Sequence, residues 1–171
     1  MSIERRERIV IILNQSLQPV SGTDLAKKLG VSRQVIVQDV AILRAKGYDV
    51  MATPQGYILP NKDAEMYRKA VLAVKHMPRE TMDELNILVD HGLKVLDVLV
   101  EHPLYGELKG YLMLESRRDV AKFVARVEAQ SASLLSSLTG GVHLHTVQYR
   151  NAEDLDGARK ALKEKGFLAG D

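Results

Sequence analysis

The sequence has no cysteine among its 171 residues, and this absence removes several kinds of protein at once. Without thiols there is no disulfide framework, no thiolate metal site and no cysteine nucleophile. No run of 18 apolar residues occurs either, so we expect no membrane-spanning helix and no membrane partner. The first ten residues carry charges without a following apolar region, which argues against a signal peptide. We therefore expect a cytoplasmic protein.

The sequence also has little excess of positive over negative charge, since its formal net charge is only +2. That value alone does not indicate a polyanionic partner. The charge is uneven, however: residues 1–60 hold eight Lys and Arg against five Asp and Glu, and residues 61–171 hold 16 against 17. Chance could give this difference, but so could two units with different partners. A polar stretch over 60–63 predicts a short linker, with domains over 1–60 and 64–171.

The first sixty residues show helical periodicity followed by a hairpin pattern. Ser21 and Ser32 are good N-caps, and Gly30 between them can take the positive φ that ends a helix. The pattern predicts a helix over 3–16, a helix from Ser21 to Gly30, a helix from Ser32 to about 46, and strands over 49–52 and 57–59. Two short helices joined by a Gly-Val-Ser turn and followed by a hairpin predict a winged helix-turn-helix.

The second helix of that motif carries side chains suited to reading DNA. With Ile36, Val40 and Leu43 turned inward, its other face is mostly polar. Arg can fork onto guanine, Gln can pair with adenine, and a small apolar side chain can touch a thymine methyl group. The helix start and the wing tip can reach phosphates. The predicted DNA-binding residues are Ser32, Arg33, Gln34, Val37, Gln38, Thr53 and Gln55. The alternative is a winged helix used for protein contacts, with these side chains merely solvated.

The remaining residues alternate between strand and helix patterns. Strands are predicted over 70–74, 95–100, 111–114 and 142–149, and helices over 81–91, from the cap Ser116 onward, and over 154–165. The order βαββαβα predicts a mainly antiparallel sheet with helices on one face, as in ferredoxin-like split βαβ domains. The whole chain is therefore expected to be α+β, with a winged helix-turn-helix followed by a ferredoxin-like domain.

Three histidines and a glutamate are expected to meet at one end of that sheet. His143 and His145 are two residues apart on a strand and face the same side. His76 follows the first strand, which in a ferredoxin-like sheet lies antiparallel beside the fourth, and Glu84 lies one turn into the next helix. Nitrogen and oxygen ligands of this kind suit zinc, nickel or iron(II). The alternative is that each histidine is structural. Two further histidines are expected at the opposite end: His91 and His102.

A small anion could complete such a site. The helix that begins at Ser116 offers backbone N–H groups, and Arg117 adds a guanidinium that could hold a carboxylate. Strand polarity predicts that this helix start lies at the same end of the sheet as the histidines. Arg79 and Arg118 are alternative cations. Ser116 could instead be an ordinary cap beside a surface arginine.

Catalytic signatures are missing from the sequence. It has no nucleophile elbow, no phosphate loop and no paired-carboxylate pattern. Glu84 is the nearest candidate base, and the argument above uses it as a metal ligand. A DNA-reading domain joined to a ligand site favours a sensor, so we expect no enzyme. A metal-dependent hydrolase is the rival class.

Several segments resemble the niacin-responsive transcriptional repressors of bacteria. Those proteins join a winged helix-turn-helix to a domain named for its three histidines, and the resemblance covers nearly the whole chain. The helix-turn-helix is generic, whereas the Gly-Val-His-Leu-His stretch with His76 upstream is more specific. The segments that carry the resemblance are 31–39, 53–57, 102–106, 116–120 and 138–146.

The resemblance implies a function more specific than the spacing does. It implies repression of NAD biosynthesis and niacin uptake genes, with nicotinic acid as co-repressor. The metal ligands would be His76, Glu84, His143 and His145. We hypothesise that the metal accepts the pyridine nitrogen while Arg117 holds the carboxylate. A homodimer is expected, because two recognition helices one turn apart read half-sites on one face of DNA. The alternative is a regulator whose effector is the metal itself.

Overall fold

The computed structural model describes residues 1–60 and 66–170. Contacts divide the chain into two compact units, Met1–Ala64 and Glu65–Asp171. The predicted linker falls mostly outside the described residues, so the domain limits inferred from the sequence stay predictions. None of the described helices is long and apolar enough to cross a membrane.

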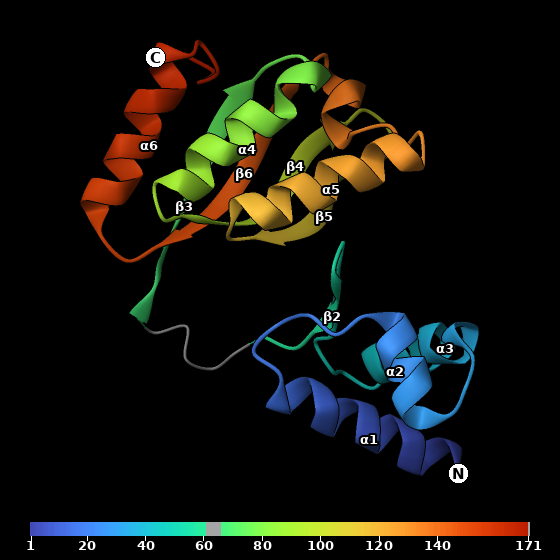
Figure 1. Ribbon diagram of the computed structural model, residues 1–171. Coiled ribbons are helices and arrows are strands. Elements are labelled where there is room, and N and C mark those ends of the chain that lie inside the picture. The colour runs from blue at the N-terminus through green and yellow to red at the C-terminus, as the bar shows by residue number, and fades with distance from the viewer. Residues whose placement is uncertain (61–65, 171) are drawn as a thin grey trace. The chain divides into compact units, whose positions relative to one another are not determined.

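The N-terminal unit consists of three helices and a two-stranded hairpin (Figure 1). Its elements are α1 (Ser2–Gln15), α2 (Gly22–Leu29), α3 (Arg33–Ala45), β1 (Met51–Thr53) and β2 (Gly56–Ile58). Both predicted serine caps are present: the Ser21 hydroxyl accepts from the Asp24 N–H at 3.0 Å, and the Ser32 hydroxyl accepts from the Val35 N–H at 3.3 Å. Gly30 ends α2 with a φ of 67°.

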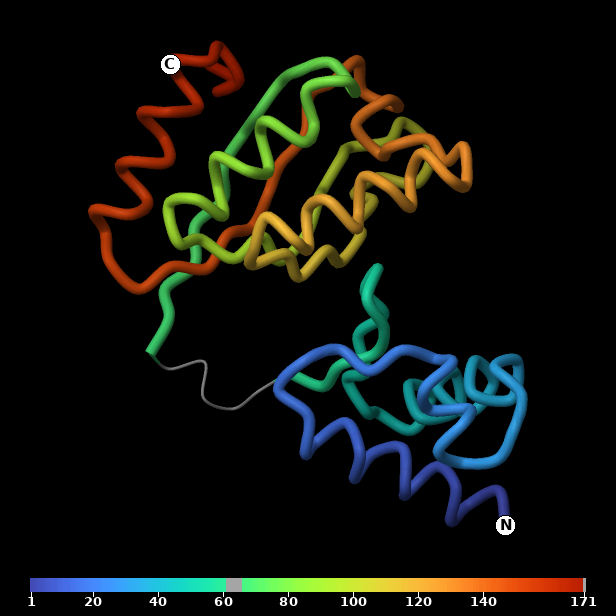
Figure 2. Tube along the Cα trace, viewed as in Figure 1, coloured from blue at the N-terminus to red at the C-terminus, as the bar shows by residue number. Residues whose placement is uncertain are grey.

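One apolar cluster holds these helices together and decides which side of α3 faces outward. It contains the predicted stripe of α3 packed against α1 and α2, namely Ile36, Val40, Leu43, Ile9, Leu13 and Leu25. The hairpin projects from the helical body (Figure 2) and is joined to it at Val20, whose N–H donates to the Tyr57 carbonyl at 2.8 Å. A helix-turn-helix with a wing is therefore the observed architecture of this unit.

The C-terminal unit is a four-stranded sheet with helices packed on one face. Its elements are β3 (Arg68–Lys75), η2 (Pro78–Glu80), α4 (Thr81–Asp90), β4 (Lys94–His102), β5 (Gly106–Leu114), α5 (Arg117–Ala129), η3 (Leu135–Thr139), β6 (Val142–Tyr149) and α6 (Ala152–Glu164). Figures 1 and 2 show α4 and α5 lying across the same face of the sheet, and α6 contributes Leu155, Ala158 and Leu162 to the same core. All strand pairs are antiparallel. The predicted α+β class is confirmed.

The order of the strands differs from the ferredoxin-like prediction. The order is β3-β6-β4-β5, whereas a ferredoxin-like sheet would place β5 between β3 and β4. In the observed order β4 lies beside β6, and Asp97 of β4 contacts β6 twice: its carbonyl accepts from His145 Nδ1 at 2.7 Å and its carboxylate accepts from the Thr146 N–H at 3.0 Å. These contacts join residues far apart in the chain, so the pattern of a single strand does not reveal them.

Candidate functional site

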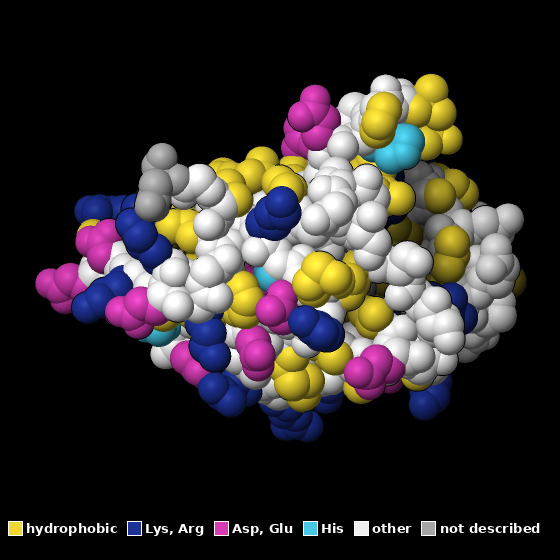
Figure 3. All heavy atoms as spheres, turned by 90° about the horizontal axis from the view of Figure 1, so that it is seen from above, with side chains coloured by type: hydrophobic (Ala, Val, Ile, Leu, Met, Phe, Trp, Pro, Cys, Tyr) yellow, Lys and Arg dark blue, Asp and Glu magenta, His cyan; other side chains and the backbone are white. Residues whose placement is uncertain are grey.

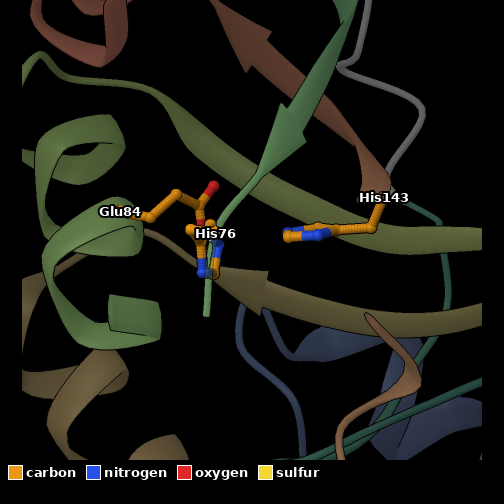
Figure 4. A group of neighbouring side chains, drawn as sticks. All are labelled: His76, Glu84 and His143. Carbon is orange, nitrogen blue, oxygen red and sulfur yellow. The ribbon is translucent and has the colours of Figure 1, made fainter. Parts of the chain in front are cut away.

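The predicted metal ligands converge at the end of the sheet where β3 finishes and β6 begins, called here the histidine end. Antiparallel pairing sets Val74 opposite His143 and Leu72 opposite His145. Paired residues share a face, so both imidazoles lie on the helix-covered face of the sheet. His76 comes directly after β3, and Glu84 lies in the first turns of α4. Figure 4 shows the side chains of His76, Glu84 and His143 approaching one another from these three elements.

The ligand atoms of these side chains are close enough for a single ion. One ligand atom each from His76, Glu84 and His143 lie within 4.8 Å of one another. His145 reaches the same carboxylate, with its Nε2 3.2 Å from Glu84 Oε1, while the Nε2 of His76 is 3.4 Å from Glu84 Oε2. All four residues are buried, and Figure 3 shows only small areas of histidine on the face that it displays.

Each histidine is oriented through its other ring nitrogen. The Nδ1 of His76 is 2.9 Å from the Met77 carbonyl, that of His143 is 2.9 Å from the Gly141 carbonyl, and that of His145 is 2.7 Å from the Asp97 carbonyl. A carbonyl oxygen can only accept, so Nδ1 carries the proton in all three rings. In the neutral rings Nε2 therefore keeps a free lone pair. This is the orientation in which second-shell carbonyls hold metal-binding histidines.

The cluster leaves several buried polar atoms without a hydrogen bond. Among the described residues, the Nε2 atoms of His76 and His145 and both carboxylate oxygens of Glu84 have no hydrogen-bond partner while the rings are neutral. A proton on either Nε2 would pair that ring with Glu84. Buried polar atoms of this kind are rare, because each costs free energy when unpaired. A divalent cation would satisfy all of these atoms together. The donor set, three imidazoles and one carboxylate, fits zinc, nickel or iron(II).

The electrostatics of the cluster give its members different charges. Burial alone would raise the pKa of Glu84, but the surrounding histidines, His145 first, lower it to about 2. Burial lowers the pKa of His143 to about 4, so this ring is neutral at physiological pH. Burial also acts to lower the pKa of His76 and of His145, but their contacts with Glu84 outweigh it and both pKa values are raised. The cluster thus contains one anion and two readily protonated rings.

Two residues that the sequence analysis did not single out support the cluster. Gly141 has a φ of 96°, and a Cβ there would lie 2.4 Å from the His76 carbonyl oxygen. Only glycine therefore lets the start of β6 pass so close to the end of β3. Asp97 orients His145 through its carbonyl and accepts from the Thr146 N–H through its carboxylate at 3.0 Å. In the sequence, the Gly-Gly pair before the His-x-His stretch was the signal that could have pointed to Gly141.

The structure does not bring the predicted anion-binding pair to the histidine end. Leu114, near the end of β5, pairs with Val95 at the start of β4, so Ser116 and Arg117 lie at the opposite end of the sheet. The argument from strand polarity was wrong, because β5 returns from the hairpin at the histidine end and runs away from it. Arg117 is exposed and donates to both carboxylate oxygens of Asp90, at 2.7 and 2.5 Å.

The other candidate residues of this unit are placed by the same register. Arg79 lies in η2, between His76 and Glu84 in the chain, and is exposed. Arg118 follows Arg117 in α5, away from the cluster. The expected position of His102 was wrong, because it ends β4 at the histidine end, where its Nδ1 accepts from the N–H groups of Leu104 and Tyr105. His91 caps α4, and its Nδ1 lies 2.8 Å from the Ile87 carbonyl.

The predicted DNA-reading residues lie on α3 and on the wing of the N-terminal unit. Four of them are exposed at the start or on the outer side of α3: Ser32, Arg33, Gln34 and Gln38. Val37 on α3 is half-buried, as are Thr53 and Gln55 on the wing. The Thr53 hydroxyl donates to the Gly56 carbonyl at 2.9 Å and accepts from the Gln55 N–H at 3.2 Å. Thr53 therefore shapes the wing turn, and a role of these residues in DNA contact stays a prediction.

A buried ion pair fixes α3 against α1 and was missed from the sequence. Asp39 is 2% exposed in the middle of α3. Its carboxylate accepts from Arg5 Nε at 2.5 Å and from an Arg6 guanidinium nitrogen at 3.4 Å. The sequence analysis had no signal for this contact, because Arg5 and Arg6 stand in an ordinary charged run. The pair anchors the predicted recognition helix to its neighbour.

Comparisons with known proteins agree with this architecture. The chain matches the HTH domain family over residues 5–58 and the 3H domain family over residues 69–171. It is 47% identical over 165 residues to the probable transcription repressor NiaR of Thermotoga maritima, covering 96% of this chain and 93% of that protein. It is 40% identical over 173 residues to the transcription repressor NadR of Bacillus subtilis, covering 100% and 96%. An uncharacterized protein of Methanothermus fervidus is 33% identical over 116 residues, which are 63% of this chain and 18% of that protein.

Proposed function

We propose that this chain, which belongs to the family of HTH and 3H domain transcription repressors that includes NiaR and NadR, represses NAD biosynthesis and niacin uptake genes with nicotinic acid as co-repressor. The domain matches and the two repressor relatives confirm the family predicted from the sequence motifs. The chain is a DNA-binding regulator and not an enzyme, as expected. The target genes and the effector are the proposed part.

The observation that carries the proposal is the buried cluster of unpaired ligand atoms at the histidine end. His76, Glu84, His143 and His145 would hold a divalent metal, for which zinc, nickel and iron are the candidates. The bound metal would supply a coordination position that suits an aromatic nitrogen such as that of a pyridine. A nitrogen heterocycle with a carboxylate, as in nicotinic acid, would then need only one further cation.

A co-repressor acts by binding the DNA-competent state more tightly than the other state. DNA must then tighten co-repressor binding by the same factor, because the coupling is reciprocal. Two copies of the reading head in a homodimer would contact two half-sites, each through the outer face of α3 and the wing. The effector would raise the population of dimers in which the distance between the two heads matches the distance between the two half-sites.

Binding to operator DNA in the presence and absence of effector and metal tests this function. The DNA is a fragment that the purified protein itself selects from a random pool. Affinity is measured with nicotinate, nicotinamide or neither, in metal-replete and chelator-treated samples. We expect nicotinate alone to tighten binding and chelation to abolish the gain. If metal tightens binding regardless of nicotinate, the metal is the effector and the co-repressor proposal is wrong.

Metal affinity is expected to depend steeply on pH. Histidine binds metal as the neutral ring, so protons compete with the metal. Because the pKa values of His76 and His145 are raised, both rings take up protons as pH falls, and affinity should drop by up to about 100-fold per pH unit below both pKa values. His143, whose pKa is about 4, adds no proton above pH 5. Calorimetry in buffers of different ionisation enthalpy should show at most two protons released per metal.

The carboxylate of the effector is expected to depend on Arg79 rather than on Arg117. Arg79 lies in the short segment between two of the proposed metal ligands, whereas Arg117 lies at the other end of the sheet. Arg79→Ala should weaken nicotinate binding about tenfold or more, since a charge-assisted hydrogen bond is lost. Arg117→Ala is the matched control and should leave the affinity unchanged. Titration calorimetry on metal-loaded protein measures both, and the reverse pattern would restore the original assignment to Arg117.

A further inference from the structure

The residues that follow α6 pack back onto the sheet beside the histidine end. Gly166, with a φ of 74°, ends the helix in the left-handed conformation and reverses the chain. Residues 167–169, called here the α6 tail, then run beside β3, with an antiparallel bridge between Leu168 and Val74. Residues near a terminus are usually poorly ordered unless contacts tie them down, and here the contacts lie next to the first proposed metal ligand.

Two backbone hydrogen bonds hold the α6 tail against the end of β3. The Lys75 N–H donates to the Phe167 carbonyl at 2.8 Å, and the Ala169 N–H donates to the Ala73 carbonyl at 2.9 Å. Because β3 lies at the edge of the four-stranded sheet, its outward backbone groups need partners from another segment. Lys75 directly precedes His76, so the tail fixes the backbone from which the His76 ring projects.

The side chain of Phe167 lies against that ring. Phe167 is 5% exposed, and the centroids of the Phe167 and His76 rings are 5.4 Å apart, with an interplanar angle of 58°. The His143 ring also contacts His76, at 4.8 Å and 86°, and the Met77 carbonyl orients it through Nδ1. Aromatic rings at these separations pack with preferred geometries, so Phe167 restricts the directions in which the Nε2 of His76 can point.

We propose that Phe167 is a positioning residue of the metal site, and that the α6 tail holds His76 where it can share an ion with the other three proposed ligands. This inference rests on the metal-binding part of the proposed function. Residues that orient the ligands of a metal typically contribute about 10-fold to 100-fold to its affinity. The alternative is that Phe167 only fills the apolar core to which it belongs.

Substitution of each phenylalanine by leucine in the full chain separates these two roles. Phe167→Leu is expected to raise the dissociation constant for cobalt(II) about tenfold or more. Phe123→Leu is the matched control, because Phe123 is the other phenylalanine of the chain and packs against the same core from α5, which carries none of the proposed ligands. It should leave the cobalt affinity unchanged. Melting temperatures of the metal-free variants compare how much stability each has lost.

A spectroscopic readout distinguishes positioning of His76 from a general loss of stability. The visible absorption of bound cobalt(II) depends on the number and arrangement of its ligands. At saturating cobalt, Phe167→Leu should give a spectrum that differs from that of the native protein. Phe123→Leu should give the native spectrum, even where its melting temperature has fallen as far.

Hydrogen exchange on the native protein tests the α6 tail without any substitution. If attachment of the tail strengthens metal binding, bound metal must slow detachment of the tail by the same factor. The N–H groups of Lys75 and Ala169, which are bonded across this contact, should therefore exchange about tenfold more slowly when cobalt is bound. The N–H groups of β5, at the opposite edge of the sheet, are the internal control and should not change.

Three results would overturn the proposal. The first is an equal cobalt affinity and an unchanged spectrum in Phe167→Leu, and the second is an equal loss in Phe167→Leu and Phe123→Leu. The third, which decides the matter if Phe167→Leu does not fold, is exchange of the Lys75 and Ala169 amides that cobalt slows no more than that of β5. Native protein that binds no cobalt would overturn the metal site together with this inference. The co-repressor proposal is judged separately, by the effect of nicotinate on DNA binding.

Discussion

Glu84→Ala is expected to lower the affinity for zinc or nickel by about 1000-fold or more. This carboxylate is the one anion among the four proposed ligands, and its two oxygens lie 3.4 and 3.2 Å from the Nε2 atoms of His76 and His145. Its removal leaves three imidazoles without charge compensation for a divalent ion. Competition with a chromophoric chelator measures the affinity of the native and variant proteins.

A second readout separates loss of metal from loss of fold. Metal that binds only the folded protein raises its melting temperature in proportion to the logarithm of the metal excess. The native protein should show this rise and Glu84→Ala should not, while Glu128→Ala, an exposed glutamate on α5, should behave as the native protein does. A Glu84→Ala protein that keeps its metal affinity would exclude the histidine end as the metal site.

Gln38→Ala is expected to reduce the affinity for operator DNA by about 10-fold to 100-fold. Gln38 is exposed on α3 beyond the buried stripe, and a bidentate contact between glutamine and adenine discriminates by about 1–3 kcal/mol per half-site. The loss should be confined to the operator. Affinity for random DNA, and the slope of its logarithm against the logarithm of salt concentration, should stay the same because the phosphate contacts are untouched.

The control for this prediction is Gln130→Ala, an exposed glutamine that follows α5 in the other unit. Gel-shift or fluorescence-anisotropy titrations on operator and random fragments measure all three proteins. An equal loss on both kinds of DNA would mean that Gln38 contacts the backbone or supports the helix. An unchanged affinity for both kinds of DNA would mean that Gln38 of α3 is not part of the DNA-reading surface.

Features set by short stretches of sequence were predictable. The caps Ser21 and Ser32 and the apolar stripe of α3 follow from local spacing, and the structure reproduces them. The convergence of His76 with His143 needed only that the first and fourth strands of the second domain pair. That pairing is common to the ferredoxin-like order and to the observed one.

Features set by competition between distant segments were not predictable. Whether β4 pairs with β6, as observed, or β5 pairs with β3, as in the ferredoxin-like order, depends on contacts between distant residues, such as those of Asp97 with His145 and Thr146. The predicted position of Ser116 was wrong for a related reason. The direction in which β5 runs depends on the β4–β5 hairpin, which starts β5 at the histidine end and places Ser116 at the opposite end. Asp39 and Asp97 escaped notice since their partners are 34 and 48 residues away.

The close approach of Gly141 to the His76 carbonyl would also affect how quickly the proposed metal site captures an ion. It holds the two strand ends together, and three backbone carbonyls hold the imidazoles at fixed orientations. Ordering loose side chains would cost rotamer entropy, but here that ordering is complete when the chain folds. Metal uptake by the folded protein should then be limited by the exchange of water from the hydrated ion. The rate should follow the water-exchange rates of the metals, with nickel entering much more slowly than zinc.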